Sequence, residues 1–100
     1  MKILITGAAL AKAHQLKSGM TDAEIVLGDY MDLPQFMLSS GDMMGLPNPK
    51  SSSYTHEMLT LCLDNGIDFV HILREPEATQ LLKASQLFEE YNIELRNEVH

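Results

Sequence analysis

The sequence has 100 residues, of which 45% are hydrophobic and 21% are charged, and this predicts one folded domain over residues 1–100 and excludes a two-domain enzyme of this length. Fourteen acidic residues against seven basic ones give a formal net charge of −7, which repels phosphate groups, so we expect no nucleic acid partner. No apolar stretch approaches the roughly 20 residues that cross a bilayer, and the N-terminus does not resemble a signal peptide, so we expect no membrane contact and a cytoplasmic location.

The N-terminal part predicts a strand, a turn, a helix and a second strand. Residues 2–6 are a short apolar run that ends at Gly7, as expected of a strand that is buried on both faces and followed by a turn. Residues 8–16 are rich in alanine and other good helix formers. Residues 24–27 are again apolar and predict the second strand.

Residues 30–53 predict mostly irregular chain, with one short helical turn over residues 35–38, because prolines, glycines and serines are frequent. Apolar side chains nevertheless gather in this segment, and they are Met31, Phe36, Met37, Leu38, Met43, Met44 and Leu46. Flexible thioethers suit irregular apolar contacts. Two interpretations are open: these side chains cover the domain's own sheet, or they form a surface that binds a partner or a second copy.

A helix and a third strand follow. Apolar residues recur at helical spacing from Tyr54 onward, after a cap at Ser52 or Ser53, and Gly66 ends this helix. Residues 67–73 are apolar enough to predict a buried strand.

The last elements are a helix and a fourth strand. Pro76 suits a first helical turn, and apolar residues then recur at three- and four-residue steps as far as Tyr91. Glu77 and the other charged side chains of this segment are expected mostly outside that apolar stripe. Asn92 is expected as a left-handed cap, and residues 93–96 predict the strand.

The alternation of strands and helices predicts an α/β fold, a three-layer Rossmann-like domain with a short parallel sheet of four strands in the order 2-1-3-4. In such sheets ligands bind beyond the carboxyl ends of the strands, where the winding reverses. That place lies between the strands that end at Thr6 and Leu73. We therefore expect any small-molecule site to involve residues 7–9 and 74–77.

The cofactor-binding candidates in this crevice are Gly7, Ala8, Ala9, Asp29, Arg74 and Glu75. Gly7 before a helix, with Asp29 about 20 residues later, imitates part of the dinucleotide fingerprint, in which a carboxylate holds a ribose hydroxyl. The second and third glycines of that fingerprint are absent, and the Cβ of Ala9 crowds the place of a pyrophosphate. The alternative is a tight turn followed by an aspartate that faces water.

Several other residues with reactive or charged side chains can be interpreted either as functional or as structural. Arg74 can bind a carboxylate or phosphate at a helix N-terminus, or it can form a surface ion pair or a structural cap. His71 is expected as a packed core histidine, and Cys62 as an inert buried thiol. Asp29 and Asp32 are expected as solvated loop charges rather than as a cation site, which needs more oxygen ligands than two carboxylates supply. The sequence thus predicts no catalytic residue, no metal site and no cofactor.

Three segments together resemble a known family: KILITGA at residues 2–8, YTHEMLTLCLDNGIDFVHIL at residues 54–73 and FEEYNIEL at residues 88–95. Their order and spacing resemble the pre-ATP-grasp domain, the biotin carboxylase N-terminal domain-like fold of carbamoyl-phosphate synthases and carboxylate-amine ligases. The similarity covers nearly the whole chain. In this family the turn after the first strand often touches the substrate, whereas here that turn has one glycine, Gly7.

The resemblance implies a domain without the ATP-grasp module, which carries the family's phosphate-binding lysines and magnesium-binding carboxylates. We therefore expect no complete enzyme, but a non-catalytic, stand-alone pre-ATP-grasp-like domain that acts through protein contact or self-association, for example as a homodimer. A second hypothesis is a trans-acting subunit of a split ATP-grasp ligase, which binds an ATP-grasp partner chain. A third is a small nucleotide- or NAD-binding protein.

Overall fold

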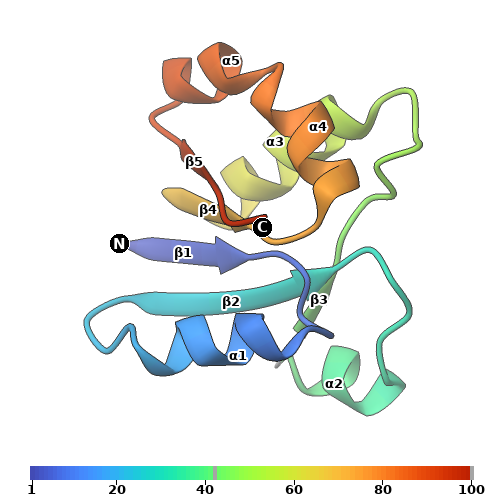
Figure 1. Cartoon of the computed structure of the whole chain (residues 1–100), viewed down its shortest axis with the longest axis vertical. Coiled ribbons are helices and arrows are strands. Elements are labelled where there is room, and N and C mark those ends of the chain that lie inside the picture. Colours follow the sequence, from blue (N-terminus) through green and yellow to red (C-terminus); the bar gives the residue numbers. More distant parts are fainter. Residues whose placement is uncertain (42, 100) are drawn as a thin grey trace.

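The computed structural model describes residues 1–41 and 43–99, and the strands of this part form one parallel sheet in the order β3-β2-β1-β4-β5. The strands are β1 (Lys2–Ile5), β2 (Glu24–Asp29), β3 (Met43–Gly45), β4 (Phe69–Ile72) and β5 (Glu94–Asn97). The helices are α1 (Ala11–Ser18), α2 (Gln35–Ser40), α3 (Tyr54–Asp64), α4 (Glu75–Leu82) and α5 (Ser85–Glu90). Figure 1 shows α1 on one side of the strands and α3, α4 and α5 on the other. No helix in the described part is long and apolar enough to cross a membrane.

This architecture confirms the predicted α/β class, with a parallel sheet between helices. The predicted strands correspond to β1, β2, β4 and β5, and these lie in the predicted order relative to one another. The prediction of a four-stranded sheet was wrong, because β3 adds an edge strand beside residues Leu27–Asp29 of β2. The three residues Met-Met-Gly are too few to show a strand period, so only the pairing with β2 reveals this strand.

The segment after β4 also differs from the prediction, because the single helix expected up to Tyr91 is divided into α4 and α5. The backbone leaves the helical conformation at Ala84, where φ is −109° and ψ is 17°. Lys83 and Ala84 are good helix formers, so local propensity does not mark the break. The second helix instead directs Phe88 into the core, where it is fully buried.

The sheet divides the core into two layers, because successive side chains of a strand point to opposite faces. Leu4 of β1 points into the larger layer, which contains buried side chains of α3, α4 and α5: Tyr54, Met58, Leu59, Cys62, Ala78, Leu81 and Phe88. Ile3 and Ile5 point into the smaller layer, where Ala13 of α1 covers them. The first strand is therefore buried on both faces, as predicted.

The winding of the sheet reverses at β1, which pairs with β2 on one side and β4 on the other. Hydrogen bonds join the carboxyl ends of β1 and β4: Thr6 N donates to His71 O at 3.0 Å, and Leu73 N donates to Thr6 Oγ1 at 3.0 Å. This is the position at which the predicted crevice lies.

Candidate functional site

The turn after β1 forms the floor of the candidate site. Gly7 has a φ of +70°, and a Cβ there would lie 3.1 Å from both Leu10 Cδ1 and Leu73 Cβ, so this position requires glycine. Ala8 N donates to Gly28 O at 2.9 Å, which fixes the turn against the end of β2. The turn therefore lies close to Asp29, the next residue of β2.

Asp29 and Arg74 form the centre of the site. The guanidinium Nε donates to Asp29 Oδ1 and Nη2 donates to Oδ2, each at 2.8 Å. The same carboxylate accepts a hydrogen bond from Ala9 N at 3.0 Å and another from Met31 N at 3.2 Å. The Asp29 side chain is completely buried, and Arg74 lies over the ring of Tyr30 with its Cζ 5.6 Å from the ring centroid.

The surroundings of this pair keep both groups charged. Burial alone would raise the pKa of Asp29, but the hydrogen bonds from Arg74, Ala9 and Met31 hold it below its ordinary value. The hydrogen bond to Asp29 raises the pKa of Arg74 further above its already high ordinary value. Each charge thus neutralises the other, and neither group is a free acid or base at neutral pH.

The structure brings together some of the predicted crevice residues and separates others. Gly7, Ala9, Asp29 and Arg74 meet at the reversal of the winding. The interpretation of Asp29 as a side chain facing water was wrong, because the hydrogen bonds from Arg74 and the backbone make its burial possible. Glu75 has an exposed side chain and lines a separate pocket of about 640 Å³ between α4 and the segment after β5.

Sequence reasoning did not find Tyr54 and Glu77, which lie beneath this crevice. Glu77 was expected mostly outside the apolar stripe of its helix, but its side chain is fully buried. Its Oε2 accepts a hydrogen bond from the Tyr54 hydroxyl at 3.2 Å. The spacing to Leu81 was the available signal, since residues four apart share one helical face and Leu81 is buried too.

Two histidines and the cysteine occupy structural positions outside this site. His71 is buried, as predicted, and its Nδ1 lies 3.3 Å from Glu98 Oε1. Cys62 is fully buried, as predicted, and burial raises the pKa of its thiol to about 12. His14 Nε2 donates to Ala8 O at 2.9 Å and so supports the turn after β1. Within residues 1–41 and 43–99, no group of three or more His, Cys, Asp and Glu side chains is arranged to hold a metal ion.

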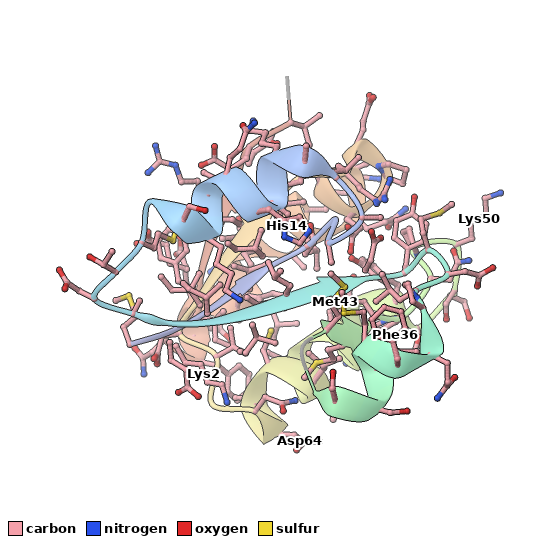
Figure 2. The ribbon with its side chains drawn as sticks, turned by 90° about the horizontal axis from the view of Figure 1, so that it is seen from below. Lys2, His14, Phe36, Met43, Lys50 and Asp64 are labelled. Atoms are coloured by element: carbon pink, nitrogen blue, oxygen red, sulfur yellow. The ribbon has the colours of Figure 1, made fainter. Side chains whose placement is uncertain are left out.

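A second candidate site is the apolar surface formed by Met31, Phe36 and Leu38, called here the α2 surface. These side chains are 50%, 68% and 37% exposed. Helix α2 packs beside β3 and buries none of its residues, and Figure 2 shows Phe36 and Met43 in this part of the molecule. A pocket of about 360 Å³ adjoins the surface, lined by Tyr30, Leu33, Leu38 and Leu46 among others.

Of the apolar side chains in residues 30–53, the structure places some against the domain's own sheet and leaves others at the surface. Leu46 is buried in the larger core layer, and the half-buried Met44 packs against the same layer. Met43 packs against the smaller layer. The three side chains of the α2 surface are the most exposed of this group, and Phe36 is the most exposed of the three.

No protein-family model matches the sequence, and no curated protein matches it.

Proposed function

We propose that this chain is a non-catalytic domain that acts through protein contact, and that it associates with a second copy of itself through the α2 surface and the neighbouring edge strand β3. The observation that carries the proposal is the exposure of Phe36, at 68%, next to Met31 and Leu38. Apolar patches of this kind on a folded domain commonly mark interaction sites, and methionine suits a surface that must adapt to its partner.

A comparison of the two edge strands also favours the β3 edge of the sheet as the place of association. At one edge of the sheet, β5 carries Glu94 and Arg96, which are charges of the kind that prevent two sheets from pairing. At the other edge, β3 has the sequence Met-Met-Gly and carries no charge. Two copies that meet through β3 across a two-fold axis would bury the same patch on both partners.

The crevice gives less support to the alternative of a nucleotide- or NAD-binding protein. In a Rossmann-like dinucleotide site, the amides after the first strand and the carboxylate after the second strand face the ligand. Here the Ala9 amide and Asp29 are hydrogen-bonded to each other, and Arg74 occupies both oxygens of the carboxylate. A ligand would have to replace these contacts.

The split-ligase hypothesis concerns the same surface with a different occupant, an ATP-grasp partner chain. It rests on the sequence resemblance and stays a prediction, as does the cytoplasmic location. A test of the first proposal also addresses this alternative, because a purified ATP-grasp module can be added to the chain in the same measurement.

The proposal is tested by measuring molar mass by light scattering at micromolar concentration. We expect the wild type to have twice the chain mass of 11.2 kDa and Phe36→Asp to be monomeric. Leu63→Asp is the matched control, because Leu63 is 48% exposed on α3 rather than on α2 or β3, and this variant should remain dimeric. Added salt should strengthen the dimer, since the net charge of −7 opposes association.

A monomeric wild type, or a dimer that Phe36→Asp leaves intact, would overturn the proposal. If the wild type is monomeric and binds an added ATP-grasp module, the split-ligase hypothesis is favoured.

A further inference from the structure

Glu77 is a buried acid that the proposed function does not use. Its side chain lies in the first turn of α4 and is completely buried. Oε2 accepts the hydrogen bond from Tyr54 of α3, whereas Oε1 is sealed from solvent without a hydrogen-bond partner among the described residues. A buried oxygen without a partner is costly for a neutral carboxyl group and far more costly for a carboxylate.

The groups around Glu77 come from several elements and act in opposite directions. Burial is the largest influence, and with the negative charge of Asp29 it raises the pKa of Glu77 from its ordinary 4.5 to about 7. The hydroxyl groups of Thr6 and Tyr54 and the positive charge of Arg74 oppose that shift. Tyr54 stays a neutral donor, because burial raises the pKa of its own hydroxyl.

We propose that Glu77 is a proton-controlled lock between α4 and α3, closed when its carboxyl group is neutral and loosened when it loses its proton. Loss of the proton places a second negative charge near Asp29, inside the core, where only the hydroxyl groups of Thr6 and Tyr54 and the charge of Arg74 offset it. Movement of the first turn of α4 toward water then lowers the free energy, because water solvates the carboxylate. Because Arg74 immediately precedes α4, this movement also loosens the ion pair in the crevice.

The sign of the pH dependence follows from linkage. The pKa of Glu77 is raised in the folded state, so the stability that the neutral group permits is fully present below about pH 4.5 and is lost as pH rises to about 7. Over this interval we expect the unfolding equilibrium constant to increase on the order of 100-fold because of Glu77. Glu77→Gln keeps the shape of the side chain without the charge, so it should remove most of this increase. Glu75→Gln is the matched control, because Glu75 is exposed in the same turn, and it should keep the increase.

Cys62 reports the loosening itself. It is the one cysteine of the chain and is buried on α3 in the larger core layer, so a thiol reagent reaches it only when that layer opens. Rates are divided by those of the urea-unfolded protein at each pH, which removes the intrinsic reactivity of the thiolate. We expect this relative rate to rise about 10-fold or more from pH 5 to pH 8 in the wild type and in Glu75→Gln, and to stay level in Glu77→Gln. A wild-type rate that stays level, or an equal rise in Glu77→Gln, would overturn the proposal.

A second measurement does not depend on the folding of Glu77→Gln. Carbon NMR of glutamate carboxyl groups in the wild type should show one group, Glu77, that titrates near pH 7. Tyr54→Phe removes the hydroxyl donor that favours the carboxylate, so it should move this midpoint to higher pH. If every glutamate titrates near its ordinary value, the lock does not exist.

Discussion

Arg74 meets Asp29 side-on, with Nε on one carboxylate oxygen and Nη2 on the other, each at 2.8 Å. Asp29 ends β2 and Arg74 follows β4, and these strands are separated in the sheet by β1. The pair therefore spans the reversal of the winding, which is the place where folds of this class bind ligands.

Asp29→Asn is expected to lower the free energy of unfolding by on the order of 3 kcal/mol. The amide has one acceptor oxygen, so Arg74 keeps its charge in a mostly covered position with half of its partner lost. Urea unfolding at neutral pH measures the change. Asp32→Asn is the control, because Asp32 is exposed, and its effect should stay within about 0.5 kcal/mol. A similarly small effect of Asp29→Asn would falsify the structural role of the pair.

The same pair predicts how the domain responds to acid. The folded pKa of Asp29 lies below its ordinary value of 3.8, so its stabilising contribution is fully present above that pH and is lost as pH falls through the folded pKa. The charge of Asp29 also raises the pKa of Glu77, so the comparison is made with Glu77→Gln present in both proteins. In this background, the difference in unfolding free energy that Asp29→Asn makes should be constant between about pH 5 and pH 7 and shrink below about pH 4. A difference that stays constant down to about pH 2 would contradict the lowered pKa.

The sequence allowed the relative order of β1, β2, β4 and β5 to be predicted, because it follows from long-range rules on crossovers and winding. Short apolar runs located β1, β2 and β4, because strands in the middle of a parallel sheet are covered by helices on both faces. It did not reveal β3, whose three residues become a strand only beside β2.

The ion pair shows a second limit of sequence reasoning. Asp29 and Arg74 were each identified as candidates, but 45 residues separate them and only the fold shows that they bind each other. Glu77 was missed for a related reason, since a charged residue beside an apolar stripe is usually solvated. Its burial depends on the Tyr54 hydroxyl, which a different helix supplies.

Gly7→Val is expected to destabilise the domain by roughly 2 kcal/mol or more, because a branched side chain at positive φ is strained and the nearest atoms lie 3.1 Å from any Cβ. Thermal unfolding monitored by circular dichroism measures the loss. Gly19→Ala is the control: Gly19 has a φ of −84°, and the nearest atom to its Cβ would be Leu16 O at 3.7 Å. This variant should be as stable as the wild type or slightly more stable.

Substitutions of Phe36 and Met44 should have different effects, although both residues belong to the same apolar segment: the first should weaken association and the second should weaken folding. Phe36 is 68% exposed, so Phe36→Asp should change the free energy of unfolding of the monomer by no more than about 0.5 kcal/mol. Met44 packs against the larger core layer, so Met44→Asp places a charge against apolar side chains and should cost about 2 kcal/mol or more.

Urea unfolding at a concentration where light scattering shows only monomer measures both effects without a contribution from association. Light scattering at higher concentration then shows whether Phe36→Asp is a folded monomer. If Phe36→Asp unfolds the chain as readily as Met44→Asp does, Phe36 belongs to the core, and the α2 surface is not an interface. If Met44→Asp leaves stability unchanged, Met44 instead faces the partner, and the interface extends from α2 onto the side chains of β3.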